Sequence, residues 1–380
     1  MSPTLPSQRH LFDIPRDVAY FNCGYMSPLL RTAVEAGREA IQRKAYPWTL
    51  TPPDFFRELQ QLRELFGALL GTTPDDVAVV PSVSYGMAIA ARNLPVGPGQ
   101  RVLMLDGDFP SVVYAWQARC AAAGAEAVLL PRPEDHDWTR VVLEAIDDRT
   151  AVAALPACHW TDGALLDLVQ IGDRLREVGA TLAVDTTQSL GVMPFDLKAV
   201  RPDFLAAAAY KWLLGPYSVG FLYVDPRWQS GEPIEYSWMA REGSEDFGGL
   251  VHYRGGFQPG ARRFDVGEPS NFALLPVAID GLRQLHAWGV ERIYASVSRL
   301  ASAIAERLAP LGLQAVPGGL RAGHYLGLRR SGGLPPGLGA QLSAQGIWVS
   351  LRGDALRITP HLYNDQHDLE RLVAALSPLL

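Results

Sequence analysis

The chain has 380 residues, of which 48% are hydrophobic and 19% charged, and its formal net charge is −6. This balance predicts a globular protein with ample core, and charges of both signs are interspersed, which excludes the basic surface of a nucleic-acid-binding protein. We find no apolar signal segment, no run approaching the ~18 apolar residues of a membrane helix and only three widely spaced cysteines, so we expect a cytoplasmic protein without membrane partner, disulfide framework or metal site.

The N-terminal part begins with an arm. Residues 1–17 are rich in proline and polar residues, and we expect them to pack late or on a partner. A strand over 18–21 enters the Gly- and Pro-containing turn 22–28. A helix is expected over 28–45, and apolar residues at helical spacing predict another from Asp54 onward.

Short apolar strands alternate with helices between residues 77 and 185. Such repetition predicts a mainly parallel sheet covered by helices on both faces. The expected strands are 77–80, 101–105, 125–130, 151–155 and 181–185, and the expected helices start near 87 and 111 and span 138–146 and 166–178.

The connection after the strand 77–80 is a candidate anion site. Its residues Pro-Ser-Val-Ser-Tyr-Gly place free backbone N–H groups and the positive end of a helix dipole at one point. A serine at a helix start is also an ordinary cap. The segment lacks the Gly-x-Gly-x-x-Gly turn of a nicotinamide-binding dehydrogenase, which argues against that class. A second polar connection follows the strand 151–155, and we expect its Trp160 and Thr161 to face a substrate.

Two ionisable groups stand where two buried strands are expected to end. Asp185 closes the strand 181–185, and Lys211 follows the apolar run 204–209. Open α/β sheets bind ligands beyond the carboxyl ends of their strands. A lysine desolvated there has a lowered pKa and can form a Schiff base, whereas an aspartate can keep a pyridinium nitrogen protonated. Together they predict a pyridoxal phosphate (PLP) site, although either residue alone is more simply a strand-end charge or a cap.

The C-terminal part has a different pattern. The Gly-rich segment 231–260 is expected to be a functional or interfacial loop. Helices are expected at 272–288 and 290–308, a strand at about 323–328, then a Gly/Pro hinge and a short helix. The segment 347–358 predicts a hairpin about Gly353-Asp354.

The hairpin carries two arginines. Pairing Arg352 with Ala355 and Ser350 with Arg357 puts both arginines on one face, because side chains alternate along each strand. One arginine alone is easily a surface charge. Two on one face of an apolar hairpin suggest a carboxylate clamp, because guanidinium binds carboxylate as a bidentate fork.

These patterns predict an α/β protein with a three-layer, mainly parallel sheet and a smaller α+β C-terminal domain. We expect an N-terminal arm over 1–17, a large PLP-binding domain over 18–265 and a small C-terminal domain over 266–380.

The segment that begins at Asp185 also resembles a known family. The pattern Asp-x-x-Gln-Ser-x-Gly, followed after about twenty residues by Tyr-Lys-Trp-x-x-Gly-Pro, resembles the core of the fold-type I PLP enzymes of the class V aminotransferase group. This group includes cysteine desulfurases, kynureninases and isopenicillin N epimerases, and the likeness extends, with gaps, over most of the chain. It implies that Lys211 holds the cofactor as a Schiff base, Asp185 pairs with the pyridine nitrogen, Gln188 approaches the phenolic oxygen and Tyr210 reaches the phosphate.

The resemblance implies further cofactor contacts. Ser84 and Tyr85 match the phosphate-contact pair, and Phe109 matches the ring that stacks on the pyridine, although an ordinary buried Phe is the alternative. The turn Gly267-Glu268-Pro269 matches one that reaches the phosphate of a partner subunit. The resemblance therefore implies a homodimer with shared active sites.

It also implies substrate contacts. Arg357 matches the arginine that binds the substrate carboxylate, and Arg352 is placed to assist it. Tyr25 lies in the segment that lines the substrate mouth, an ordinary loop being the alternative.

The reaction type stays open between several branches. Lys211, once freed, is the nearest base for the Cα proton of an amino acid, and transamination, racemisation and β-elimination all follow from its removal. Cysteine desulfurases need a late nucleophilic cysteine, and none follows Cys158. Phe109 and Tyr210 favour a kynureninase, but Gln188 disfavours it. We expect an aminotransferase, with a lyase (kynureninase-like or C–S β-eliminating) or an epimerase as alternatives, and a non-catalytic PLP-fold protein as the alternative from another class.

Overall fold

A seven-stranded sheet forms the centre of the larger lobe in the computed structural model, which describes residues 4–380. Its strands are β2 (Val77–Val80), β3 (Arg101–Leu105), β4 (Glu126–Leu130), β5 (Thr150–Pro156), β6 (Thr181–Asp185), β7 (Phe204–Ala208) and β8 (Gly220–Val224). They are ordered β2-β8-β7-β6-β5-β3-β4. All neighbouring pairs from β7 to β4 are parallel, and β8 runs antiparallel to both its neighbours. The expected mainly parallel sheet is confirmed.

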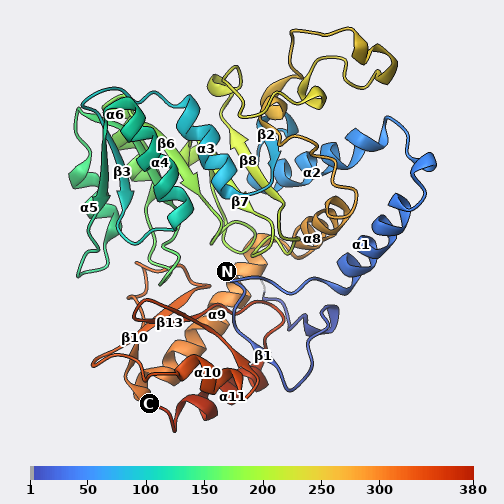
Figure 1. The fold of residues 1–380 in the computed structure, drawn as a ribbon. Helices are drawn as coiled ribbons and strands as arrows, with labels where there is room; N and C mark the ends of the chain where they lie inside the picture. The colour runs from blue at the N-terminus through green and yellow to red at the C-terminus, as the bar shows by residue number, and fades with distance from the viewer. Residues whose placement is uncertain (1–3) are drawn as a thin grey trace.

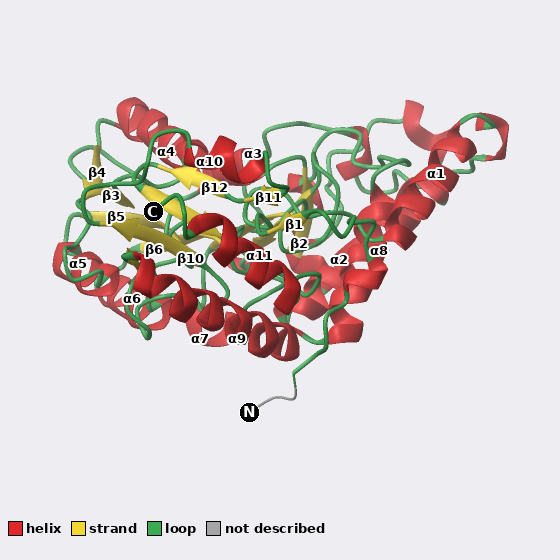
Figure 2. Cartoon of the chain, turned by 90° about the horizontal axis from the view of Figure 1, so that it is seen from below, coloured by secondary structure: helices red, strands yellow, loops and turns green. Residues whose placement is uncertain are grey.

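Helices cover both faces of this sheet (Figure 2). The helices of the chain are α1 (Arg31–Lys44), α2 (Asp54–Leu70), α3 (Val83–Asn93), α4 (Pro110–Ala123), α5 (Trp138–Ala145), α6 (Leu168–Glu177), α7 (Leu197–Val200), α8 (Leu275–Trp288), α9 (Val290–Leu308), α10 (Leu338–Ser343) and α11 (Gln366–Leu376). Side chains alternate along each strand, so that Leu205 of β7 joins the core under α2, α5 and α6, whereas Ala206 joins the core under α3 and α4. The two apolar layers explain why the strands are nearly continuous hydrophobic runs.

Most helix ends follow from local chemistry. Gly71 and Gly124 end α2 and α4 in the left-handed conformation, with φ of 76° and 67°. The side chain of Asp167 accepts hydrogen bonds from the first turn of α6. The first helix begins at Arg31, three residues later than expected, because Leu30 is extended.

The C-terminal lobe contains a second sheet, antiparallel throughout, in the order β12-β13-β10-β9. Its strands are β9 (Leu313–Gln314), β10 (Leu326–Arg330), β12 (Ser350–Arg352) and β13 (Ala355–Ile358). The predicted hairpin register is confirmed, since Arg352 pairs with Ala355 and Ser350 with Arg357. The hairpin begins later than expected, with β12 at Ser350. The preceding residues form β11 (Ile347–Trp348), which pairs in parallel with β1 (Ala19–Tyr20) instead. The division of the chain at residues 265 and 266 stays a prediction.

The N-terminal segment lies against the C-terminal lobe of its own chain (Figure 1). Arg9 is buried and pairs with Asp368 of α11 at 2.9 Å. It also donates to the backbone carbonyls of Pro15 and Val18 at 2.8 and 2.7 Å. These contacts tie the first described residues to the last helix.

None of the helices among residues 4–380 combines the length and the apolar character that crossing a lipid bilayer requires.

Candidate active site

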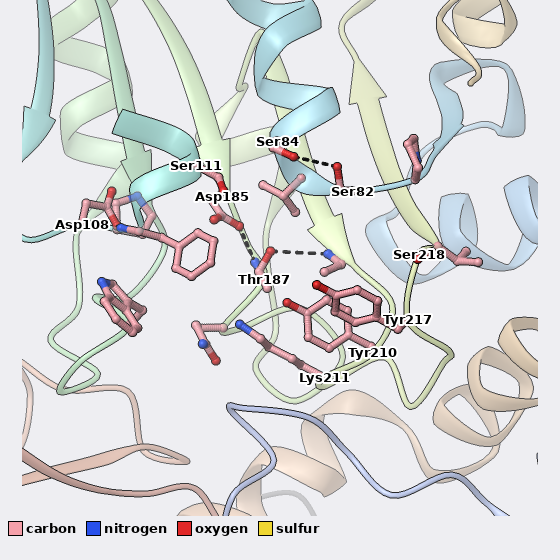
Figure 3. Close-up of a pocket in the computed structure, with 18 of the residues that line it drawn as sticks. Ser82, Ser84, Asp108, Ser111, Asp185, Thr187, Tyr210, Lys211, Tyr217 and Ser218 are labelled. Carbon is pink, nitrogen blue, oxygen red and sulfur yellow. Dashed lines mark hydrogen bonds between the residues drawn. The ribbon is translucent and has the colours of Figure 1, made fainter. Parts of the chain in front are cut away.

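A cavity of about 350 Å³ lies beyond the carboxyl ends of β5, β6 and β7 (Figure 3). Small-molecule sites have volumes of about 300–1,000 Å³. Its ionisable lining residues are Asp108, Cys158, Asp185, Tyr210, Lys211 and Tyr217. The structure thus brings the two groups expected at strand ends, Asp185 and Lys211, to one cavity.

Adjacent strands deliver these two groups. Asp185 is the last residue of β6 and pairs in parallel with Ala206 of β7. Lys211 follows β7 by three residues, in a turn that returns the chain to β8. In Figure 3 the Lys211 side chain extends toward the cavity below Asp185 and Thr187.

The Lys211 amine is held in an apolar setting. The residue is 6% exposed, and Nζ lies 5.5 Å from the ring centroids of both Phe109 and Tyr210. Burial lowers the pKa of the amine to about 8, an effect that the charge of Asp185 opposes and those of Arg357 and Arg352 increase. A neutral, nucleophilic amine is therefore accessible slightly above neutral pH.

Two carboxyl groups line the opposite part of the cavity. Burial raises the pKa of Asp185, while hydrogen bonds from Thr187 and the charge of Lys211 oppose the rise. Burial also raises the pKa of Asp108 to about 8, with a smaller contribution from the charge of Asp185. Asp108 Oδ1 accepts from the Phe109 N–H at 2.6 Å, and Oδ2 has no partner among residues 4–380. Burial thus favours the neutral form of Asp108, whereas the hydrogen bonds from Thr187 and the charge of Lys211 favour the carboxylate form of Asp185.

Hydroxyl groups gather at the start of α3. Ser82 caps this helix by accepting from the Tyr85 N–H, and its Oγ lies 2.8 Å from the Oγ of Ser84. The helix N-terminus adds free N–H groups and its positive dipole end. Ser218 and Tyr217, which follow Lys211 in the chain, line the same region. This end of the cavity fits an anion.

Aromatic rings form the walls. Phe109 and Trp160 meet edge to face, with centroids 5.6 Å apart, and Tyr210 packs on Tyr217 at 4.6 Å. The Trp160 indole donates to the Gly107 carbonyl at 2.8 Å, which fixes the plane of the ring.

Gln188 is held by four partners, one of which is the Cys158 thiol, which donates to the Gln188 carbonyl at 3.5 Å. Its Oε1 accepts from the Trp212 indole N–H at 3.0 Å, and its Nε2 donates to the Gly24 carbonyl at 3.0 Å. Indole only donates and a carbonyl only accepts, so the orientation of the amide is settled. The backbone carbonyl of Gln188 lies 2.7 Å from Nε2 of His324, whose pKa burial lowers to about 4, so His324 is neutral and donates. Gln188 lines the cavity, and the second N–H of its Nε2 has no acceptor among residues 4–380.

The two arginines of the hairpin meet at Trp160. Their guanidinium carbons lie 5.9 Å (Arg352) and 6.0 Å (Arg357) from the indole centroid. Arg357 is 1% exposed and donates from Nη1 to the Trp160 carbonyl at 3.1 Å and from Nη2 to Ser350 Oγ at 3.3 Å. Arg352 and Arg357 thus lie on the same face of the hairpin, as predicted, next to Trp160 at the cavity wall.

Three residues expected at the site lie elsewhere or at its edge. The side chain of Tyr85 turns away and donates to Glu235 at 2.9 Å. Glu268 lines a different depression, to which α1 and α2 contribute Ile41 and Phe55. Tyr25 is 52% exposed at the mouth and does not line the cavity.

Sequence reasoning missed several lining or supporting residues. Asp108 directly precedes Phe109, and its position close to a strand end could have indicated that it lines the site. Thr187, Tyr217 and Ser218 flank residues that were singled out. His324 supports Gln188 from 136 residues away in the chain, and no local pattern marks it.

Comparison with known proteins agrees with this geometry. The family model described as Aminotransferase class-V matches residues 53–372. An uncharacterized aminotransferase, YcbU, of Bacillus subtilis is 31% identical over 320 residues, covering 82% of this chain and 81% of the relative. The isopenicillin N epimerase of Streptomyces clavuligerus is 28% identical over 395 residues, covering 95% of each chain. The solved complex of the cystine C–S lyase C-DES with cysteine persulfide has a TM-score of 0.84 at 20% identity, covering 96% of this chain and 98% of that one.

Proposed function

Because the chain belongs to the class V aminotransferase family and is a PLP-dependent enzyme, we propose that it is a transaminase in which Lys211 is the catalytic residue. One observation carries the proposal: two buried groups of opposite sign, Lys211 and Asp185, line one cavity whose far end is a helix N-terminus with two serines.

The lining residues fit the cofactor group by group. The serines at the start of α3 suit its phosphate, and Asp185 suits its ring nitrogen. The free N–H of Gln188 suits the phenolic oxygen, and the Phe109 ring suits the face of the pyridine. Tyr210 adds a wall at the phosphate end.

The protein's own groups then carry out the proton chemistry. PLP, when bound, supplies an aldehyde that condenses with amines and a ring that withdraws electrons from the substrate Cα. Asp185 holds a proton at the ring nitrogen, which keeps that withdrawal strong. Lys211 would be the group that takes the proton from the substrate Cα. Arg357 orients the substrate through its carboxylate.

The lining residues favour transamination over the alternatives. Lys211 is the one basic side chain among the described residues that line the cavity. A single lysine can remove a proton from Cα and return it elsewhere on the same face, as transamination requires. An epimerase needs proton return from the opposite face, for which the described lining residues offer no second basic side chain.

The cysteines argue against persulfide chemistry. Cys23, Cys120 and Cys158 are buried and free. Burial raises the pKa of each of these thiols, and a thiol rather than a thiolate is a poor nucleophile. A kynureninase-like or β-eliminating lyase stays as the alternative reaction.

The proposal includes a homodimer in the cytoplasm. Large apolar side chains are exposed on the segments 41–48 and 236–253, for example Trp48 at 77% and Tyr253 at 100%. Figure 1 shows the loop that follows β8 projecting beyond the sheet. A second copy covering these segments would bring Glu268 toward a neighbouring site, and analytical ultracentrifugation tests it.

Reconstitution tests the proposed function. The purified protein is mixed with PLP, its absorbance is recorded, and borohydride reduction is followed by peptide mass spectrometry. We expect a coloured protein with the reduced adduct on Lys211 and none in Lys211→Ala. A colourless protein, or an adduct that persists in the variant, contradicts the proposal. Keto-acid release from a panel of amino acids then separates transamination from elimination and epimerisation.

A further inference from the structure

The two arginines beside Trp160 have no acidic partner within the part of the chain that the structure describes. Neither Arg352 nor Arg357 forms an ion pair among residues 4–380. The acidic residue of the hairpin, Asp354, forms an ion pair with Arg329, with 2.9 Å between Nε of Arg329 and Oδ1 of Asp354. A buried guanidinium without a counter-charge is costly. We therefore expect anionic groups of a ligand to bind the two arginines.

Arg357 alone can bind one carboxylate. Its neutral partners, the Trp160 carbonyl and Ser350 Oγ, use two of its five N–H groups. Nε is buried and has no partner within the described part of the chain. The Nε–H and a free N–H on the adjacent Nη form the fork that grips a carboxylate with two hydrogen bonds. No second arginine is needed for that carboxylate.

Arg352 is available for a different anion. Its Nη1 donates to the carbonyl of its neighbour Leu351 at 2.8 Å, and the described residues offer no acceptor to its other N–H groups. Hairpin register places it diagonally across from Arg357, nearer the turn. Burial, and then the charge of Arg357, lowers the pKa of Arg352, so the two cations repel each other across Trp160.

The two arginines also differ in burial. Arg357 is 1% exposed, whereas Arg352 is partly exposed. Arg352 is therefore the one of the two that a second anion can reach from the solvent side.

We propose that the substrate is an amino acid with two carboxylates, of which Arg357 binds the one next to the amine and Arg352 the distal one. The inference rests on the proposed PLP-dependent function and adds the substrate class. Trp160, whose indole centroid lies 5.9 and 6.0 Å from the guanidinium carbons of Arg352 and Arg357, offers an apolar surface to the methylene groups between the carboxylates.

Binding of simple carboxylates tests the proposal without turnover. The PLP-loaded protein is titrated by calorimetry with acetate and butyrate and with succinate, glutarate and adipate. We expect one of the dicarboxylates to bind at least tenfold more tightly than the monocarboxylates. In Arg352→Gln this advantage is lost, whereas butyrate binding changes less than twofold. Arg352→Lys, which keeps the charge but loses the fork, retains part of the advantage.

Matched variants sharpen the result. Arg357→Gln should weaken mono- and dicarboxylates alike, and Arg38→Gln, which removes a remote charge on α1, should change neither. For turnover, Arg352→Gln should lower kcat/KM for glutamate or aspartate at least tenfold more than it lowers kcat/KM for alanine. Equal affinity for both classes, or equal losses for both in Arg352→Gln, overturns the substrate class.

The outcome is distinguishable from failure of the proposed function. Absence of the reduced adduct on Lys211 refutes PLP chemistry itself. A normal adduct without discrimination between mono- and dicarboxylates refutes only the substrate class.

Discussion

Lys211 is a cation in a place that favours the neutral amine. Its Nζ faces two aromatic rings at 5.5 Å, and the nearby arginines add repulsion. The negative charge of Asp185 offsets this only in part. The charged Lys211 amine in this apolar setting therefore destabilises the folded, cofactor-free protein.

Replacement of Lys211 by methionine should stabilise the cofactor-free protein at pH 7. The folded-state pKa of about 8 lies below the 10.5 of a free lysine, so between these values the unfolded chain binds the proton more readily and stability rises with pH. Below pH 8 the whole penalty is present, roughly 3 kcal/mol at 1.36 kcal/mol per pKa unit. Urea titrations at pH 7 and at pH 10.5 should show the gain at the lower pH alone.

The exposed Lys198 on α7 provides the control. Lys198→Met should leave the free energy of unfolding within about 0.5 kcal/mol at both pH values. A Lys211→Met variant that is no more stable than the parent at pH 7 would show that the amine is not desolvated.

The ionisable residues at two strand ends could be predicted from the sequence, but the side chains that surround them in the folded protein could not. Asp185 and Lys211 follow apolar runs whose strand character is unambiguous. Asp108 has the same kind of position, yet its burial depends on packing that no local pattern shows. For Tyr85 the family pattern gives the position in the chain, whereas the turn of α3 directs its side chain to Glu235.

At the scale of elements, the turn after β6 is held by side chains from two distant segments. Trp212 fixes the amide of Gln188, and His324, just before β10, fixes its carbonyl. Elements of both lobes thus set the direction of one N–H at the cavity wall.

Replacement of Trp212 by phenylalanine should release the amide of Gln188. Without the indole donor the amide can turn over, and the free N–H leaves the cavity wall. Loss of one hydrogen bond is worth about 1 kcal/mol, so we expect roughly fivefold weaker PLP binding. The pH midpoint of the PLP absorbance change should shift as well. Both are measured by titration of the cofactor-free protein.

Trp116 on α4 is the matched control. It is buried, and its indole nitrogen has no partner in the range 4–380, so Trp116→Phe creates a similar void without removing a hydrogen bond. Equal effects of the two variants on PLP affinity and on the pH midpoint would contradict a positioning role for Trp212.

Sequence periodicity predicted elements well where the pattern was local. The hairpin register followed from alternation about Gly353-Asp354, and it is confirmed. The pairing of β1 with β11 joins residues more than 300 positions apart, and two-residue strands carry no periodic signal. The same lack of signal explains why β9 was missed.

At the scale of the whole molecule, the chain ends are joined by a buried ion pair. Arg9 and Asp368 are almost fully enclosed, and Arg9 uses further N–H groups on Pro15 and Val18. Removal of one partner leaves an uncompensated buried charge, which costs about 3–5 kcal/mol.

Arg9→Met should therefore lower the free energy of unfolding by about that amount, measured by urea denaturation at pH 7. Arg16, whose side chain is 65% exposed, pairs with Asp365 only a few residues from Asp368. Arg16→Met should cost no more than about 1 kcal/mol. Similar losses in both variants would mean that the arm contributes through general packing and not through the buried pair.

The pairing of β1 with β11 has a consequence for biosynthesis. All strands of the large sheet lie between residues 77 and 224, so the ribosome delivers them long before residue 347. At about 5–20 residues per second, β1 waits roughly 15 to 65 s for its partner. During that interval the segment 22–28, which later bonds to Thr359 and to Gln188, has no C-terminal lobe to rest on. While the sheet is complete and the last third of the polypeptide is still missing, the cavity has no cover, and PLP can enter it.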